Sequence, residues 1–286
     1  MVQLSRADIR TAEALALQGL HLFHHPASSC SQKVRIALNL KGLPWTSHLV
    51  DIVHHENLSA YYLGINPRGL VPALVHDGAV HIESNDILFH LESLDSAHRL
   101  IPEGRSAEVA KRLAFEDSLH ADLRNLTFGF LIRPPKLKSD EDLDAYARLG
   151  SGTVGGVADT QRPKEIAFWK RYGESGVADD AACASAAKFR AAFDELGGTL
   201  AGSAFLMGED ISLIDIAWFV YAERLRLAGY PFARLHPVLA DWLERMRAVP
   251  GVGDEVALPP PVAALVAEAR AAQVVGRRTL AEVCGL

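Results

Sequence analysis

The first third of the chain alternates short apolar runs with amphipathic stretches. Residues 20–23 form an apolar run typical of a strand, and the apolar side chains of residues 34–40 share one side of a helix that Gly42 ends. Two more apolar runs, 73–76 and 79–82, are joined by Asp77-Gly78, a strong hairpin signal, and a helix follows over residues 85–94. The order β-α-β-α-β-β-α over residues 20–95 predicts a small mixed sheet with helices on both faces.

From residue 107 to the end, the pattern is helical almost throughout. Residues 107–130 predict one long helix with an apolar side, and Arg133-Pro134-Pro135 should end it. Residues 96–106 contain Pro102 and Gly104 and are expected to be a linker. Residues 1–19 predict an extra amphipathic helix ahead of the first strand.

Residues 136–186 show the weakest pattern of the predicted helical domain, 107–286. They combine a glycine cluster with charged stretches, which favours a surface insertion. The alternative is a lid or wall of a substrate pocket, in which Trp169 and Tyr172 supply aromatic contacts.

Composition excludes several classes of function. The chain has 286 residues, 49% of them hydrophobic and 22% charged, and a net charge of −6, so it lacks the basic surface of a nucleic-acid-binding protein. No apolar run reaches the roughly 18 residues that a membrane span needs. The three widely spaced cysteines, Cys30, Cys183 and Cys284, argue against a disulfide framework or a zinc site and favour a reducing, cytoplasmic setting.

Two histidine pairs, His24-His25 and His54-His55, are the obvious candidates for metal ligands. Neither pair has the i, i+4 spacing of zinc hydrolases, and adjacent side chains on a strand point to opposite faces. We therefore expect no metal site.

The turn between the first strand and the first helix carries the strongest candidate chemistry. It delivers Ser28, Ser29 and Cys30 to a helix N-terminus, where unpaired N–H groups and the helix dipole favour an anion such as a thiolate. Serine is also a preferred N-cap, so a purely structural role is the alternative. Pro72 precedes the run 73–76 and is a candidate for a cis peptide bond, with the backbone of Val71 facing a ligand.

Three motifs in fixed order resemble the N-terminal domain of cytosolic-type glutathione transferases. They are Ser-Ser-Cys-Ser-x-x-Val-Arg-Ile-Ala-Leu, Asn-Pro-x-Gly-x-Val-Pro-x-Leu and Glu-Ser-x-x-Ile, within residues 20–95. The first is most similar to the zeta class, which includes maleylacetoacetate isomerase. The chain departs from that class at Gln32 and Lys33, where an aromatic residue and an arginine are usual, and at Glu83, where glutamine is common.

The resemblance implies a thioredoxin-like α/β domain over residues 20–95, an all-α C-terminal domain, and glutathione as cosubstrate. In this reading Ser28 contacts the glutathione sulfur, with Ser29 and Cys30 beside it; Cys30 could instead form a mixed disulfide, as in a thiol transferase. Glutathione would pair with the backbone at Leu70, Val71 and Pro72. Glu83 suits its γ-glutamyl ammonium and Ser84 its carboxylate, and His54 or His55 approaches its peptide backbone.

The implied function is a glutathione transferase or isomerase, a homodimer that activates the thiolate for attack on a hydrophobic electrophile. A glutathione-dependent lyase or etherase, or a non-catalytic binding or regulatory protein, are the alternatives. Ser212-x-x-Asp215, ahead of an apolar run, reads as an N-capping box, and it resembles the folding motif of the same family. We expect these two residues to be structural.

Overall fold

The computed structural model describes residues 2–132 and 137–286. It divides into two compact units, Met1–Leu94 with Pro134–Gly176 and Asp95–Arg133 with Val177–Leu286. We call them the sheet unit and the helical unit. The helix end predicted at Arg133-Pro134-Pro135 lies outside the described residues.

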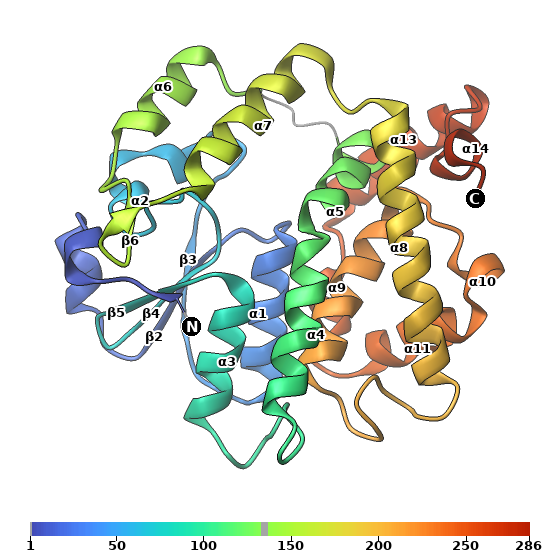
Figure 1. Ribbon diagram of the computed structural model, residues 1–286, viewed down its shortest axis with the longest axis horizontal. Helices are drawn as coiled ribbons and strands as arrows, with labels where there is room; N and C mark the ends of the chain where they lie inside the picture. The colour runs from blue at the N-terminus through green and yellow to red at the C-terminus, as the bar shows by residue number, and fades with distance from the viewer. Residues whose placement is uncertain (1, 133–136) are drawn as a thin grey trace. The chain divides into compact units, whose positions relative to one another are not determined.

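The sheet unit contains a five-stranded sheet with the strand order β1-β5-β4-β2-β3, of which Figure 1 labels β2 to β5. Strands β2 and β3 are parallel and the other neighbours are antiparallel. The predicted β-α-β-α-β-β-α order of a thioredoxin-like domain is confirmed, with β4 and β5 over the predicted residues. Its elements are β1 (Val2–Gln3), β2 (Leu20–His24), α1 (Ser29–Leu40), β3 (Thr46–Leu49), α2 (Ala60–Leu63), β4 (Ala73–His76), β5 (Ala79–Ile82) and α3 (Ser84–Leu94).

The strand alternation places apolar side chains on both faces of this sheet. Phe23 and Val75 pack in one cluster with Tyr62 of α2. Their neighbours Leu22 and Leu74 are fully buried and point to the opposite face, because successive strand residues alternate. The sheet is therefore covered on both sides, as the pattern predicted.

The helix predicted over residues 1–19 is wrong. Strand β1 pairs with β5, with Val2 opposite Ile82, and two 3-10 turns follow at Arg6–Asp8 and Ala12–Ala16. The backbone N–H of Arg10 donates to the carbonyl of Gly64 at 2.8 Å. Tertiary hydrogen bonds to the sheet edge and to the end of α2 thus outweigh the local helical pattern.

Residues 137–176, expected in the helical domain, group with the sheet unit instead. They form α6 (Asp140–Arg148), a hairpin of β6 (Thr153–Val154) and β7 (Val157–Ala158), and α7 (Gln161–Ser175). The buried carboxylate of Asp8 accepts hydrogen bonds from the Thr153 hydroxyl at 2.6 Å and from the N–H groups of Gly155 and Gly156. These bonds hold the insertion on the N-terminal segment.

The helical unit is built around α9 (Leu213–Ala228), in which almost every residue is buried. The single helix expected over residues 107–130 is divided at Leu119 into α4 (Ser106–Ser118) and α5 (His120–Leu126), followed by a π-helical turn at Thr127–Leu131. The other helices are α8 (Asp179–Leu200), α10 (Phe232–Leu235), α11 (Pro237–Ala248), α12 (Gly253–Val256), α13 (Pro260–Val275) and α14 (Leu280–Cys284). The prediction of an all-helical second domain is confirmed for the helical unit, which does not include residues 137–176 of the predicted range.

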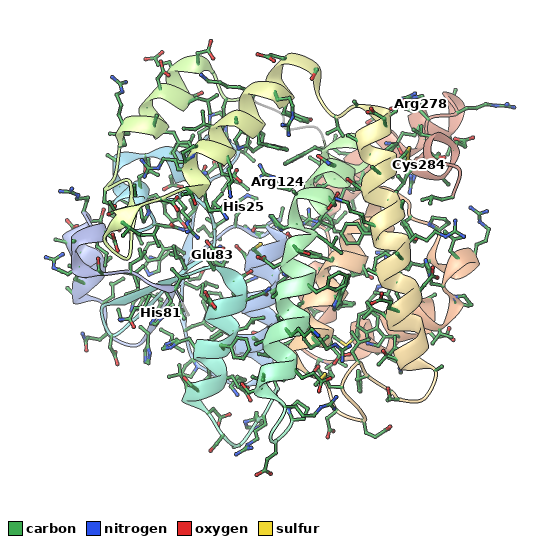
Figure 2. The ribbon with its side chains drawn as sticks, in the orientation of Figure 1. His25, His81, Glu83, Arg124, Arg278 and Cys284 are labelled. Carbon is green, nitrogen blue, oxygen red and sulfur yellow. A yellow bond between two sulfur atoms is a disulfide. The ribbon has the colours of Figure 1, made fainter. Side chains whose placement is uncertain are left out.

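A disulfide joins Cys183 of α8 to Cys284 of α14, with the two Cα atoms 4.9 Å apart. The C-terminal segment that carries Cys284 and Arg278 is labelled in Figure 2. Arg278 also forms an ion pair with Asp179 at the start of α8. The argument against a disulfide framework did not foresee this single bridge, because a sequence separation of 101 residues leaves no local spacing signal. In the part of the chain that is described, none of the helices has the length and apolar character to cross a membrane.

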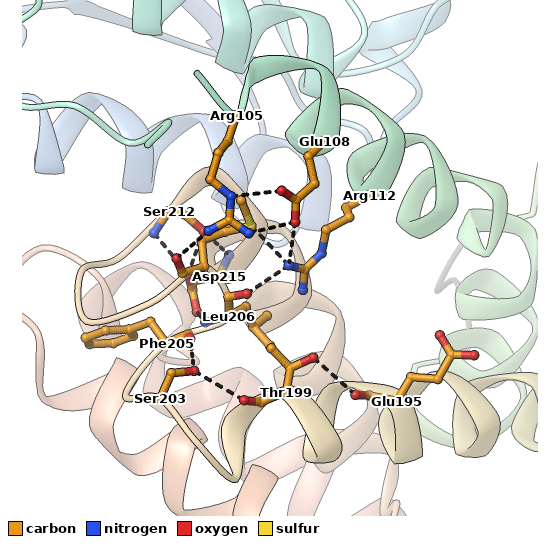
Figure 3. A network of polar contacts seen from close by, with 11 residues as sticks. Arg105, Glu108, Arg112, Glu195, Thr199, Ser203, Phe205, Leu206, Ser212 and Asp215 are labelled. Carbon is orange, nitrogen blue, oxygen red and sulfur yellow. Dashed lines mark hydrogen bonds and ion pairs between the residues drawn. The ribbon is translucent and has the colours of Figure 1, made fainter. Parts of the chain in front are cut away.

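The predicted capping box at the start of α9 is present and buried (Figure 3). One carboxylate oxygen of Asp215 accepts from the Ser212 N–H at 2.9 Å and from its hydroxyl at 2.7 Å. The other oxygen accepts from the Leu206 N–H at 2.8 Å and the Trp242 indole N–H at 3.1 Å. Ser212 and Asp215 are thus buried, and their side chains bind groups inside the helical unit.

Candidate functional site

Ser28 is the N-cap of α1, and Ser29 and Cys30 are its first two helical residues; all three are half-buried. The Ser28 hydroxyl oxygen accepts a hydrogen bond from the Ser31 N–H at 3.3 Å. The same hydroxyl donates to the Val71 carbonyl at 3.4 Å, the long end of the range. The N-terminus of α1 and the turn before β4 are therefore in contact. The family resemblance assigns both of them to glutathione binding.

A buried arginine fixes the turn that carries Ser28. The guanidinium of Arg35, from α1, donates to the carbonyls of His25 at 3.3 Å and Pro26 at 3.1 Å. It also lies 3.2 Å from the Nδ1 atom of His24. The sequence motif includes Arg35 but assigns it no role; the available signal was a charged residue between the apolar Val34 and Ile36.

Polar side chains also hold the backbone that leads to Pro72. The Leu70 carbonyl accepts from the Tyr62 hydroxyl and from the Asn66 amide, both at 2.7 Å. The Gly69 carbonyl accepts from the Asn57 amide at 2.7 Å. The Val71–Pro72 peptide bond is cis, as predicted.

Glu83 lies between β5 and α3 (Figure 2) and is followed by the buried Ser84, the first residue of α3. Its φ of +67° is in the left-handed region, which non-glycine residues adopt only where the surroundings hold them there. Arg68 supplies part of that support, since its NH1 atom lies 2.5 Å from Glu83 Oε1. The Glu83 side chain remains 38% exposed and can be reached by a ligand.

Arg68 also contacts a second carboxylate, that of Asp159, at 3.0 Å. Burial alone would lower the pKa of Arg68, but Glu83 and Asp159 more than offset this effect and raise the pKa above its usual value. The guanidinium therefore stays charged between two acids. The turn signal Asn66-Pro67-Arg68-Gly69 assigns no role to Arg68, and Asp159 belongs to no motif, so the sequence alone identifies neither residue.

The two candidate histidines have partners of their own. His54 is exposed, and its Nδ1 atom lies 2.6 Å from a carboxylate oxygen of Asp51. His55 is buried, and its Nδ1 atom lies 3.3 Å from a carboxylate oxygen of Asp142 in α6. These contacts are separate from those that join Ser28 to Val71 and Arg68 to Glu83. A glutathione contact by either histidine stays a prediction.

Comparison with known proteins supports the motifs at both ends of the chain. The family model for the glutathione S-transferase N-terminal domain matches residues 27–94, and that for the glutathione S-transferase C-terminal domain matches residues 160–245. The chain is 43% identical over 83 residues to a zeta-class glutathione S-transferase of Euphorbia esula. That match covers 29% of this chain and only 37% of the plant protein.

A second similarity runs through both units. The protein LigF of Sphingobium sp. strain SYK-6 is 28% identical over 244 residues, which cover 82% of this chain and 91% of LigF. The crystal structure of LigF, described as a β-etherase, superposes with a TM-score of 0.67 at 26% identity and covers 83% of this chain and 98% of LigF. Taken together, the two domain matches, the zeta-class similarity and this shared fold show that the chain belongs to the glutathione S-transferase superfamily.

Proposed function

We propose that this chain binds glutathione in its sheet unit and activates the glutathione thiol at the N-terminus of α1. The observation that carries the proposal is the contact of the Ser28 hydroxyl with Val71. This contact joins the Ser28 hydroxyl, a candidate hydrogen-bond donor to the thiolate, to the backbone predicted to pair with glutathione. Ser29 and Cys30 lie in the first turn of the same helix.

The proposed chemistry is stabilisation of an anion. A free thiol has a pKa of about 8.5, so only a few per cent of glutathione is thiolate at neutral pH. The N-terminal N–H groups and dipole of α1, a helix of 12 residues, favour the anion, and a hydroxyl donor adds a charge-assisted hydrogen bond. Lowering the thiol pKa by two units requires about 2.7 kcal/mol, which such interactions can supply.

Glu83 and Ser84 are the proposed anchors of the γ-glutamyl group. The exposed part of the Glu83 carboxylate suits the ammonium, and Ser84 at the start of α3 suits the carboxylate. The backbone of Leu70, Val71 and Pro72 would pair with the peptide of glutathione, as would His54 or His55 through a side chain. These contacts orient the thiol toward α1.

The bound thiolate would attack an electrophilic carbon of an apolar substrate, forming a carbon–sulfur bond. In a transferase of the EC 2.5.1.18 kind, a leaving group departs with the bonding electrons. In an isomerase, the thiolate adds to a conjugated double bond, the carbon–carbon bond rotates, and the thiolate leaves again. The similarity to LigF across both units favours a second candidate, an etherase, in which the leaving group is an aryl oxygen.

A thiol-transferase mechanism through Cys30 and a non-catalytic binding role are the remaining alternatives. In the first, Cys30 forms a mixed disulfide with glutathione. In the second, glutathione binds without turnover. Trp169 stays a candidate contact for the second substrate, whereas Tyr172 is buried and stacked on Phe168.

From the family we also propose that the protein is a homodimer, that it is located in the cytoplasm and that it detoxifies electrophiles. The Cys183–Cys284 disulfide bears on this point, since disulfides are rare in reducing compartments. Sedimentation would test the dimer, and mass spectrometry of rapidly alkylated protein from cells would test whether the disulfide forms there.

The proposed function is tested by calorimetry with glutathione, followed by turnover assays on an aryl halide, an aryl ether and a conjugated cis-enone. We expect glutathione binding and Ser28-dependent turnover of at least one electrophile. Turnover that Cys30→Ala abolishes and Ser28→Ala leaves untouched would favour the thiol-transferase mechanism instead. A chain that binds no glutathione would contradict the proposal.

A further inference from the structure

Arg68 stands between two acids that differ sharply in exposure. Its NH1 atom pairs with Glu83, whose side chain is 38% exposed, while its Nε and NH2 atoms lie 3.0 Å from one oxygen of Asp159, whose side chain is 2% exposed. A ligand can therefore reach Glu83 but not Asp159. The two carboxylates and the Arg68 guanidinium carry a net charge of −1; the guanidinium of Arg162, which also interacts electrostatically with Asp159, is bound to backbone carbonyls.

The insertion fixes Asp159 and the backbone of Arg68 together. The other Asp159 oxygen accepts from the Arg162 N–H at 3.0 Å, near the start of α7. The Arg162 side chain donates from Nε to the Pro67 carbonyl at 2.9 Å and from NH1 to the Leu149 carbonyl at 2.7 Å. The Tyr146 hydroxyl donates to the Arg68 carbonyl.

The Asn66–Gly69 turn is closely packed at Gly69. Gly69 has a φ of +61°, and a Cβ atom added there would lie 3.0 Å from the Tyr146 ring and 3.1 Å from the Asn57 carbonyl. The insertion thus packs directly on the Asn66–Gly69 turn.

Asp159 changes the charge that Glu83 presents to a ligand. A lone Arg68–Glu83 pair would be neutral, and its guanidinium would compete with any other cation for the Glu83 carboxylate. Asp159 offsets the charge of Arg68 from the buried side, where the low dielectric makes the interaction strong. Glu83 then retains a net attraction for a cation that approaches from solvent.

We infer that Asp159 is a positioning residue that makes Glu83 selective for the γ-glutamyl ammonium of glutathione. The inference rests on the proposed function and adds a residue outside the conserved-domain matches, since 159 lies beyond 27–94 and just before 160–245. The selectivity is a property of the whole group: Arg68 holds Glu83, Asp159 balances Arg68, and Arg162 with Tyr146 fixes the geometry.

The test compares two ligands in calorimetry, glutathione and its analogue that lacks the γ-glutamyl amino group. Their affinity ratio isolates the ammonium. We expect the parent to prefer glutathione by at least about tenfold, and Asp159→Asn to reduce that ratio by about three- to tenfold while changing the affinity for the analogue less than about twofold. Asp144→Asn, an exposed acid of α6 in the same insertion, is the matched control and should keep the parent ratio.

A variant of opposite sign keeps the test decisive if Asp159→Asn folds poorly. Arg68→Gln leaves a net charge of −2 and should raise the ratio above that of the parent. The double variant Arg68→Gln/Asp159→Asn has the parent charge and should bring the ratio back. A purely structural role for the group would weaken both ligands alike in every variant.

The possible results separate the two proposals. If the parent binds glutathione but Asp159→Asn keeps the parent ratio, or Arg68→Gln lowers it, the role of Asp159 is wrong and the proposed function stands. If the parent fails to bind glutathione, the proposed function is wrong and this inference falls with it.

Discussion

Ser28 in the sheet unit and Ser212 in the helical unit occupy the same position, the N-cap of a long helix. Each hydroxyl oxygen accepts from the backbone N–H three residues on, at 3.3 Å for Ser28 and 3.4 Å for Ser212. They differ in where the hydroxyl proton goes. Ser212 donates to the buried carboxylate of Asp215 at 2.7 Å, whereas Ser28 donates to the Val71 carbonyl at 3.4 Å.

This difference distinguishes a structural cap from a candidate catalytic one. The Ser212 proton is held by a charge-assisted bond in the interior, so no ligand can compete for it. The Ser28 proton makes a long bond to a neutral carbonyl in a half-buried turn, and a thiolate is a stronger acceptor. Residue type and capping position are therefore insufficient, and the acceptor of the hydroxyl proton decides the role.

The largest expected effect is on turnover in Ser28→Ala. Loss of one donor to a developing or stabilised anion costs about 10- to 1000-fold in rate. Glutathione affinity should change much less, because the peptide and γ-glutamyl contacts remain. Steady-state kinetics on the best electrophile, with calorimetry alongside, measures both. Equal losses in rate and affinity would make Ser28 a binding residue only.

Glu83→Ala should have the opposite effect to Ser28→Ala, with a loss of glutathione affinity and little loss of rate. The carboxylate is expected to bind the γ-glutamyl ammonium, so its removal should weaken glutathione binding by about 1.5–3 kcal/mol. The rate at saturating glutathione should stay near that of the parent. Calorimetry checks the affinity, and an unchanged dissociation constant would mean that the ligand binds elsewhere.

Ser212→Ala should leave kinetics alone and reduce stability instead. The variant loses a helix cap, which costs about 1–2 kcal/mol in free energy of unfolding. Denaturant unfolding measures the loss, and turnover well below the unfolding midpoint should match the parent. A selective loss of turnover in this variant would contradict the structural role of the α9 cap.

The smallest effect expected is the pH dependence that His81 of the sheet unit gives to stability. Burial, with His90 and His76 nearby, lowers the pKa of His81 in β5 to about 4. The unfolded chain binds this proton near pH 6.5, so the free energy of unfolding should fall as the pH drops from about 6.5 to about 4, by about 1 kcal/mol once solvent screening is included.

His81→Gln should flatten that part of the stability profile, measured by unfolding at a series of pH values. His98→Gln, which replaces an exposed histidine, is the control and should keep the parent slope. A parent stability that is constant over this window would contradict the role assigned to His81.

The sequence predicted the elements whose signals are local. The hairpin at Asp77-Gly78, the caps at Ser28 and Ser212, and the cis bond before Pro72 each depend on a few adjacent residues. The predictions that were wrong depend on distant contacts. Residues 1–19 have a helical pattern, but β1 instead pairs with β5, about 80 residues away. The Cys183–Cys284 bridge spans 101 residues.

In the candidate site, too, local motifs were predicted and distant contacts were not. The family resemblance assigns both Ser28 and Val71 to glutathione, and the Ser28 side chain contacts the Val71 backbone. Asp159 could not be found that way, because the role that we propose for it depends on a partner, Arg68, that lies 91 residues earlier. A lone aspartate in a glycine-rich insertion carries no signal until the fold brings it to an arginine.

The central claim, that Ser28 stabilises a glutathione thiolate, is tested most directly by titrating the thiol of bound glutathione through its ultraviolet thiolate absorption. In the parent we expect a thiol pKa about two units below the 8.5 of a free thiol, and in Ser28→Ala a return most of the way to that value. Ser212→Ala, titrated in parallel, should keep the parent value. A bound thiol with the same pKa in the parent and in Ser28→Ala would contradict the account.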